Sequence, residues 1–178
     1  MKKLYIPLLA VIFFVSESIF VSISGQVFST DYILVPRFLF MFLVFLVAYS
    51  NIRVALIYSV ITGFIFDVTY TEIWGIYLFA LPLITYMMKK AMTVLQNNIF
   101  TLSLLSIVSV IVIEFVSYFM NSILGFVSMT FQEYTTIRLL PTLLLNTIVI
   151  VVLAYPLKKV MIKYVNVDSQ DRMFGKKV

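Results

Sequence analysis

Five charged side chains interrupt the apolar stretches of this sequence, and their types limit the chemistry that it could perform. Three are carboxylates and two are guanidinium groups. Carboxylates can act as general acids or bases, and an arginine can bind a carboxylate through two parallel hydrogen bonds. They are far apart in the chain, so a site that combines them depends on how helices bring them together. The five residues are Glu17, Arg37, Asp67, Glu114 and Arg138.

The available residues do not indicate a catalytic site. The sequence contains no cysteine and no histidine, which removes thiol chemistry, the usual zinc and haem ligands and the commonest general base. The acids do not form the closely spaced aspartate pattern of a metal-dependent phosphatidyl transferase, and Asp67 lacks the Gly-x-Gly-Asp partner of an intramembrane aspartyl protease. There is no phosphate-binding loop. We therefore predict a protein that is not an enzyme and that uses no metal or cofactor.

The composition places the chain in a membrane. Of its 178 residues, 62% are hydrophobic and 12% are charged, whereas a soluble domain is about half apolar and about a quarter charged. A soluble fold of this size cannot bury so much apolar surface. Crossing the hydrocarbon core as a helix takes about 20 apolar residues. We predict an all-α integral membrane protein with six transmembrane helices, over residues 4–23, 32–50, 53–70, 72–88, 98–120 and 139–157.

Basic residues flank these six stretches unevenly. Eleven of the 13 Lys and Arg residues fall on one side of the membrane, and only Arg37 and Arg138 lie elsewhere. An excess of positive charge marks the cytoplasmic side, so we predict a multi-pass protein of the cell (plasma) membrane with both termini in the cytoplasm. Residues 1–160 then form the transmembrane domain. Residues 161–178 form a short basic cytoplasmic tail, which an anionic inner leaflet would attract.

The N-terminus has a second interpretation. The basic start MKK, the apolar run and the small residues Ser22 and Ser24 before Gly25 also resemble a cleavable signal peptide. Glu17 lies inside the apolar run and argues against that interpretation. Cleavage would leave five spans in the same orientation.

We expect the five charged residues to lie at similar depths, in the outer half of the membrane. At about 1.5 Å of rise per helical residue, Asp67 lies roughly 20 Å along its span from the cytoplasmic side, and Glu17 and Glu114 lie at similar depths. A charge at mid-membrane costs at least a few kcal/mol unless it is paired or hydrated. We therefore expect the three acids to face inward and to pair with Arg37 and Arg138. This outer-leaflet polar layer is either an outward-facing pocket or an ion network that fixes helix packing.

The stretch GFIFDVTYTEIWG joins the third and fourth expected spans. Glu72 would lie at the N-terminus of the fourth helix, where Thr71 can cap the helix and the helix dipole favours an acid. Gly63 and Gly75 would let neighbouring helices approach closely.

Two further surfaces could contact partners. The outer loop, residues 121–138, carries apolar residues at near-helical spacing, and we interpret it as a helix in the interface plane or as a docking surface. An inner basic rim either follows the positive-inside rule alone or faces an anionic leaflet or a cytoplasmic filament. We expect the lipid bilayer, and no nucleic acid, as a binding surface. The rim comprises Lys89, Lys90, Lys158, Lys159 and Lys163.

Two stretches carry a resemblance to a known family. GFIFDVTYTEIWGIYLFALPLITYMMKK, residues 63–90, resembles the central signature of the rod shape-determining protein MreD family, in which a glycine and an aspartate end one helix and a glycine opens the next. LLPTLLLNTIVIVVLAYPLKK, residues 139–159, is similar to the last helix of that family. The positions that match the family pattern are Gly63, Asp67, Gly75, Pro141 and Asn146.

The resemblance implies a non-catalytic subunit of the cell-elongation machinery. Such a protein binds MreC and, with it, connects the actin-like MreB filaments to the glycosyltransferase RodA and its transpeptidase during peptidoglycan synthesis. The resemblance also implies a fold similar to the substrate-binding subunits of energy-coupling-factor transporters. A vitamin-binding subunit of such a transporter is therefore the alternative function.

Overall fold

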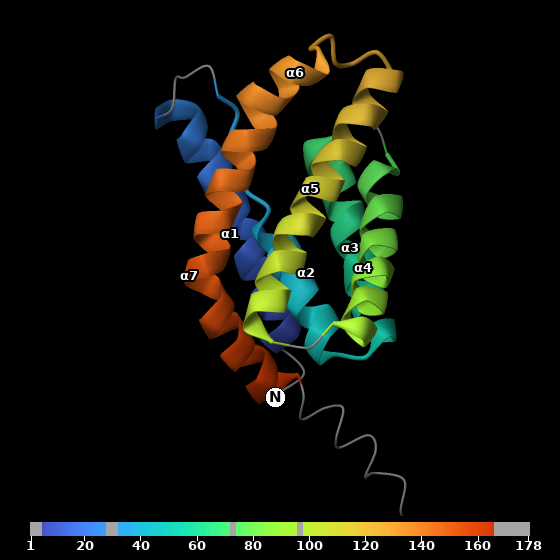
Figure 1. Cartoon of the computed structure of the whole chain (residues 1–178), viewed down its shortest axis with the longest axis vertical. Coiled ribbons are helices and arrows are strands. Elements are labelled where there is room, and N and C mark those ends of the chain that lie inside the picture. Colours follow the sequence, from blue (N-terminus) through green and yellow to red (C-terminus); the bar gives the residue numbers. More distant parts are fainter. Residues whose placement is uncertain (1–4, 28–31, 72–73, 96–97, 166–178) are drawn as a thin grey trace, which may run out of the picture.

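The computed structural model describes residues 5–27, 32–71, 74–95 and 98–165. Within those ranges the chain is helical apart from short connections, and no strand is formed. Six helices have twelve residues or more, which confirms the expected helix count, and a short helix and a π-helical segment precede the last of them (Figure 1). The elements are α1 (Tyr5–Val27), α2 (Phe38–Tyr49), α3 (Ile52–Tyr70), α4 (Ile76–Val94), α5 (Ile99–Ile123), α6 (Phe131–Tyr134), η2 (Thr135–Leu139) and α7 (Leu140–Tyr164).

Polar side chains begin several of these helices. The first N–H groups of a helix have no partner within it, and an Asn or Thr side chain at the N-cap can accept one of them. Asn51 accepts from the backbone N–H of Arg53 at the start of α3, and Asn98 accepts from that of Thr101 at the start of α5. Thr130 and Glu133 form a reciprocal capping box at the start of α6.

Four helices of the described residues are long and apolar enough to cross a membrane. They are formed by residues 5–24, 52–70, 99–123 and 131–164. Helix α2 is apolar but has only 12 residues. Helix α4 has 19 residues and carries Lys89 and Lys90. The protein is therefore a membrane protein whose helices differ in length and in position within the bundle.

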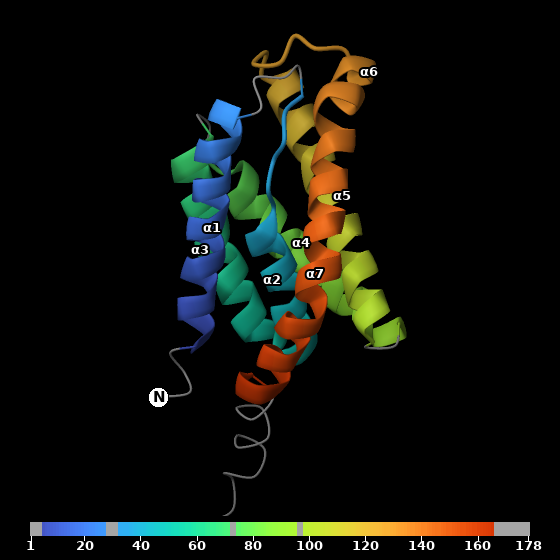
Figure 2. The same cartoon turned by 90° about the vertical axis from the view of Figure 1, so that its left-hand side faces the viewer.

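Helix α2 occupies the centre of the bundle. It packs against α1, α3, α4, α5 and α7, and nine successive residues, 39–47, are buried. A helix that is apolar on all sides is a buried helix. Figure 2 shows α2 enclosed by the longer helices, with an extended, non-helical segment of chain running down to it.

The expectation of one helix over residues 32–50 is wrong in its first part. Residues 32–37 are extended, and α2 begins only at Phe38. Pro36 explains the difference, because proline has no N–H to donate and disfavours the helical conformation of the residue before it.

The expectation of a separate helix in the interface plane over residues 121–138 is also wrong. Helix α5 continues to Ile123, and residues 124–130 form a turn and a loop. From Phe131 onward α6, η2 and α7 follow one another as a single 34-residue helical segment that ends at Tyr164. The capping box at Thr130 sets the start of this segment.

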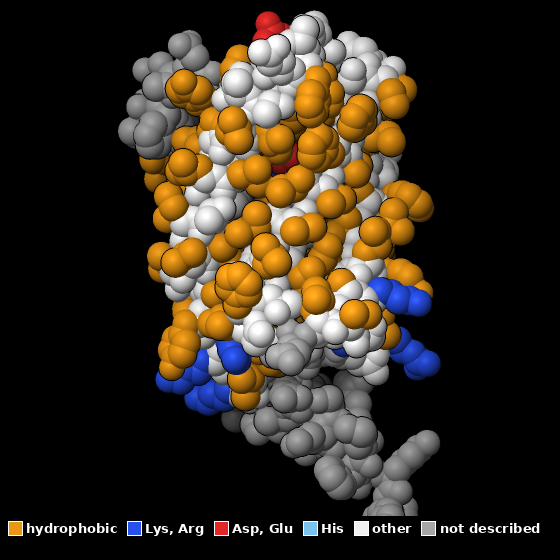
Figure 3. All heavy atoms as spheres, in the orientation of Figure 1, with side chains coloured by type: hydrophobic (Ala, Val, Ile, Leu, Met, Phe, Trp, Pro, Cys, Tyr) orange, Lys and Arg blue, Asp and Glu red, His pale blue; other side chains and the backbone are white. Residues whose placement is uncertain are grey.

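Helix α1 begins, and helix α7 ends, at the same end of the bundle. The rings of Tyr5 in α1 and Tyr164 in α7 stack with their centroids 4.2 Å apart. Basic side chains gather at this end of the molecule, and apolar side chains cover the flank above them (Figure 3). Residues 166–178, which include most of the expected tail, and Glu72 lie outside the described residues.

Candidate functional site

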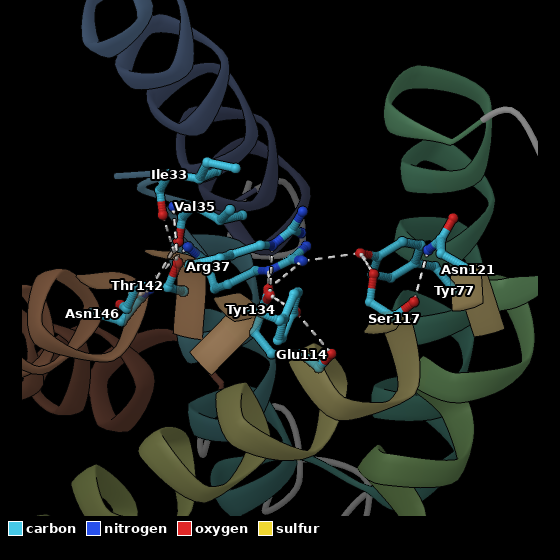
Figure 4. Close-up of polar contacts among 11 residues, drawn as sticks. Ile33, Val35, Arg37, Tyr77, Glu114, Ser117, Asn121, Tyr134, Thr142 and Asn146 are labelled. Carbon is cyan, nitrogen blue, oxygen red and sulfur yellow. Dashed lines mark hydrogen bonds and ion pairs between the residues drawn. The ribbon is translucent and has the colours of Figure 1, made fainter. Parts of the chain in front are cut away.

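The extended segment of residues 32–37 is held by the side of α7. The backbone N–H groups of Ile33, Val35 and Arg37 donate to the carbonyl of Ile137, the Thr142 hydroxyl and the Asn146 side-chain oxygen at 2.8, 3.2 and 2.9 Å. In return, the Asn146 amide donates to the carbonyl of Val35 at 2.9 Å, and the Thr142 hydroxyl donates to that of Ile33 at 3.4 Å. Alternate residues of a strand-like segment are thus paired with one face of a helix, as Figure 4 shows.

Pro141 explains why α7 can accept this segment. A proline inside a helix cannot donate to the carbonyl four residues earlier, which here belongs to Ile137. That carbonyl accepts the N–H of Ile33 instead. The π-helical segment η2 lies directly before Pro141, where the regular hydrogen-bond ladder is interrupted. Of the family-pattern positions, Asn146 binds the extended segment directly, and Pro141 leaves open the carbonyl of Ile137 that Ile33 binds.

Arg37, at the end of this segment, reaches the centre of a buried polar network. Its Nε and Nη2 groups donate to Oε1 of Glu114 at 2.9 and 2.6 Å, and Nη2 also donates to the Tyr77 hydroxyl at 2.9 Å. The second carboxylate oxygen of Glu114 accepts from Nε of Arg138 at 3.0 Å and from the Tyr134 hydroxyl at 2.8 Å. The residues converge from α4, α5, α6, η2 and the extended segment (Figure 4). Glu114 is thus held by two arginines and a tyrosine.

Glu17 lies near this network but has no side-chain partner in it. Its side chain comes from α1 and is only 2% exposed, and its carboxyl group lies beside the backbone N–H groups of Phe38 and Leu39 at the start of α2. Neither ion pair of the described residues includes it. The expectation that Glu17 forms an ion pair with an arginine is therefore wrong. The residue lies at the wall of a cavity, but both of its carboxylate oxygens are covered by protein atoms.

The cavity has a volume of about 500 Å³. It lies between α1, the extended segment, α3, α4, α5 and the 124–130 loop, in the half of the bundle away from the basic end. Ligand-binding pockets commonly have about 300–1,000 Å³. Both charged and aromatic side chains line it, including Glu17, Arg37, Phe66, Tyr70, Tyr77, Tyr118, Tyr134 and Arg138.

Asp67 serves a different purpose from the one expected. Its carboxylate does not meet an arginine, and accepts the backbone N–H groups of Gly75, Tyr77 and Leu78 at 3.0, 2.9 and 2.8 Å. These N–H groups belong to the N-terminus of α4, where the helix dipole also favours a negative charge. The expectation that Asp67 pairs with Arg37 or Arg138 is therefore wrong. Asp67 instead connects the end of α3 to the start of α4.

Glycine is required at the two family-pattern positions for different physical reasons. A Cβ at Gly63 would lie 2.5 Å from the carbonyl oxygen of Tyr77 and 2.8 Å from Cα of Leu78, so Gly63 permits the close approach of α3 and α4. Gly75 has open space around its Cα, and the expectation of close packing there is wrong. Gly75 is required by its φ of 113°, which residues with a side chain rarely adopt.

Removing the carboxylate of Asp67 should loosen the α3–α4 connection. We expect Asp67→Asn to lower the free energy of unfolding by about 1–3 kcal/mol, because charge-assisted hydrogen bonds to three N–H groups are weakened. Asp67→Ala should have the larger effect, since alanine offers no acceptor. Thermal unfolding of the purified protein in detergent measures both. Combination with Thr130→Ala, which removes the capping box of α6, should give additive losses, because Thr130 and Asp67 have no hydrogen-bond partner in common; strong coupling would contradict this assignment.

The basic rim divides into two kinds of residue. Lys89 is half-buried, and its ammonium donates to the carbonyls of Val47 and Ser50 at 3.0 and 3.2 Å, so it caps the C-terminal end of α2. Lys90, Lys159 and Lys163 are exposed, and Lys158 is half-exposed. The ammonium groups of Lys90 and Lys163 lie over the rings of Tyr86 and Tyr164.

Several residues of the site carry no charge and therefore could not be selected from the sequence. Tyr77, Tyr134 and Ser117 extend the network, and Thr142 supports the extended segment. One signal was available for Thr142. It lies four residues before Asn146, so both point from one face of a helix. The chain has 11 tyrosines, and nothing in the sequence distinguishes Tyr77 and Tyr134 from the others.

The arrangement can hold charges in place and can offer polar groups to a ligand. Both oxygens of Glu114 already accept hydrogen bonds from donors, and Asp67 is occupied by backbone N–H groups. The oxygens of Glu17 are covered by protein atoms and lie beside the N-terminus of α2. In the same part of the chain, no group of three or more possible metal ligands is formed.

Comparison with known proteins assigns the chain's sequence to a family. The family described as rod shape-determining protein MreD matches residues 2–164. The rod shape-determining protein MreD of Bacillus subtilis (strain 168) is 35% identical over 159 residues, which cover 89% of this chain and 92% of that protein. No solved structure matches the chain.

Proposed function

The chain belongs to the MreD family of rod shape-determining proteins, and we propose that it is a non-catalytic membrane subunit of the bacterial cell-elongation complex. The observation that carries this proposal is the family match, which extends over all six long helices. The site geometry agrees with it, because two of the buried acids serve helix packing. Such a subunit supports peptidoglycan synthesis by holding other proteins in place.

MreC is the proposed direct partner. Through MreC, the protein would connect MreB filaments in the cytoplasm to RodA and its transpeptidase. Association between membrane helices depends on close packing and polar contacts, because lipid is as apolar as the helix surface. Helix α1 offers a suitable surface, since only 6% of its membrane-spanning stretch is buried within the bundle.

We further propose that both termini lie in the cytoplasm. The contact between Tyr5 and Tyr164 supports this topology, because the start of α1 and the end of α7 meet at one end of the bundle. The exposed lysines of the rim gather at that end, as the positive-inside rule requires of the cytoplasmic side. Lys90, Lys158, Lys159 and Lys163 would then face the anionic inner leaflet or a cytoplasmic filament.

A second candidate function rests on the cavity. A volume of about 500 Å³ with aromatic walls suits the substrate-binding subunit of an energy-coupling-factor vitamin transporter. This second proposal includes a fold for the chain that is similar to the fold of those substrate-binding subunits. The family match favours the first function.

Depletion of the protein in a rod-shaped host, with MreC tested for co-purification, separates the two functions. We expect depleted cells to round and swell, and we expect MreC to co-purify with the tagged protein but not with an unrelated polytopic membrane protein. Expression of the wild-type chain from a second locus should restore rods. Normal rods without MreC, together with a co-purifying vitamin or transporter ATPase, would exclude the elongation function.

A further inference from the structure

Arg37 and Arg138 keep hydrogen-bond donors that the described residues do not use. A guanidinium group carries N–H donors on all three of its nitrogens and has no acceptor. Arg37 uses its Nε and Nη2 groups on Glu114 and Tyr77, and Arg138 uses its Nε group on Glu114. Within the described ranges, nothing accepts from Nη1 of Arg37 or from either Nη group of Arg138. Strong donors therefore remain for another molecule.

These unused donors are accessible, unlike the carboxylate of Glu17. Among the described residues, the buried side-chain polar atoms that are both fully covered and unpartnered are the two oxygens of Glu17. The unused Nη groups do not belong to that class, so they have accessible surface. Both arginines line the cavity of about 500 Å³, and 28% of the Arg138 side chain is exposed. A molecule in the cavity can therefore reach these donors.

The same arginines carry more charge than Glu114 neutralises. One carboxylate pairs with both guanidinium groups, so these three side chains together have one net positive charge. Glu17 attracts Arg37 from nearby, but it forms no ion pair and lies beside backbone N–H groups at the start of α2. A charge within the membrane is costly unless it is paired or hydrated. An anion in the cavity would meet both the excess charge and the unused donors.

The walls of the cavity also accommodate an apolar group. Residues 32–37 run between α1 and α7 as an extended segment, which fills less space than the helix expected there (Figure 2). Apolar side chains form much of the surrounding wall, among them Val21, Phe66 and Phe126. The site thus combines fixed cations with apolar walls.

We propose that this cavity binds an amphipathic ligand through a phosphate group, which accepts from the unused Nη groups of Arg37 and Arg138. Arginine suits phosphate because its planar group of donors matches two phosphate oxygens at once. A phosphate has enough oxygens to bind both guanidinium groups. The apolar part of the ligand lies against the apolar walls. This inference goes beyond the proposed function and does not depend on it.

Two sources can supply this chemistry. One is an anionic phospholipid that enters from the bilayer. The other is a water-soluble phosphate compound with an apolar body. Both present a phosphate next to an apolar group, and the experiment separates them.

The first experiment adds defined probes to the wild-type, full-length protein in an uncharged detergent and follows the thermal midpoint. The probes are a short-chain phosphatidylglycerol, a phosphatidylcholine of equal chain length, and phenyl phosphate. We expect the midpoint to rise with the concentration of an anionic probe, because a ligand that binds only the folded protein stabilises it. Phosphatidylcholine should have a weaker effect, because its quaternary ammonium offsets the charge of its phosphate.

Asn121→Asp tests the site without removing either arginine. Asn121 lines the cavity near the end of α5, and aspartate adds a negative charge with nearly the same shape. Repulsion within the cavity should weaken binding of the anionic probe roughly tenfold. Asn98→Asp is the matched control, because it makes the same change at the exposed start of the same helix, where aspartate also caps well. The control should bind as the wild type does.

Arg138→Gln tests the donors themselves. It removes the unused Nη groups of Arg138, and loss of charge-assisted hydrogen bonds should weaken binding roughly tenfold or more. Lys90→Gln is its control, because Lys90 is an exposed cation of the basic rim outside the cavity.

Each outcome either supports or overturns the proposal. A midpoint rise with phosphatidylglycerol but not with phenyl phosphate supports the lipid source, whereas a rise with phenyl phosphate supports a water-soluble compound. No rise with either probe overturns the proposal, and so do equal rises with the two lipids. Binding that is unchanged in Asn121→Asp also overturns it, even where Arg138→Gln fails to fold. Binding that Lys90→Gln weakens and Asn121→Asp leaves unchanged would place the phosphate on the basic rim and would likewise overturn the proposal.

Discussion

Replacement of Gly63 by alanine is expected to remove most of the folded protein. The added Cβ would lie 2.5 Å from the carbonyl oxygen of Tyr77 and 2.8 Å from Cα of Leu78. Both neighbours are backbone atoms, so no side chain can turn aside, and α3 and α4 must separate. Overpacking of a protein interior typically costs about 1–3 kcal/mol, and occasionally more. We expect an effect at or above the upper end of that range.

The yield of monodisperse protein after detergent extraction and the thermal midpoint measure this effect. Val60→Ile is the matched control, because it also adds a methyl group to α3 but at a position that is 43% exposed. The control should behave as the wild type does. A Gly63→Ala protein with a normal midpoint would show that α4 can move away from α3 without loss, contrary to the close contact described above.

Glu114→Gln is expected to be nearly as damaging. Glutamine has the same shape as glutamate, but it leaves Arg37, whose side chain is 4% exposed, without a counter-charge. Removal of one partner from a buried ion pair typically costs about 3–5 kcal/mol. The change also weakens the hydrogen bond from the Tyr134 hydroxyl and the ion pair with Arg138.

A double-mutant cycle tests whether the loss arises from the pair. Arg37→Gln combined with Glu114→Gln should be more stable than the sum of the two single losses predicts, because neither charge is then left alone. Chemical or thermal unfolding in detergent gives the four free energies. Additive losses would mean that the two residues act independently. That result would contradict the direct contacts between Arg37 and Glu114 at 2.6 and 2.9 Å.

Hydropathy predicted the positions of most helices. The expected spans 4–23, 53–70 and 98–120 differ by a few residues from α1, α3 and α5. This works because each of these helices must bury its own backbone polar groups in lipid, which requires a long apolar stretch. The same rule failed for residues 32–37, because α7 supplies hydrogen-bond partners to this segment and makes a helix unnecessary there.

The charged residues of the site could be selected from the sequence, but their partners could not. Arg37 and Arg138 do meet Glu114, yet sequence alone did not distinguish Glu114 from Asp67 or Glu17 as their partner. The expectation assumed that a buried acid needs an arginine. Asp67 shows the alternative, since the open N–H groups of a helix whose N-cap, Gly75, lies eight residues later can serve as well. Gly75, with its positive φ, brings those N–H groups back to the carboxylate.

The order of synthesis and the order of assembly differ in this protein. The backbone groups of Ile33, Val35 and Arg37 find their partners on α7, more than 100 residues later in the chain. A ribosome therefore delivers this segment long before Thr142 and Asn146 exist. Because lipid offers no hydrogen bonds, the segment must stay with water at the membrane surface until the last helix arrives. The extended segment that leads into the central helix is therefore completed only when the last helix is present.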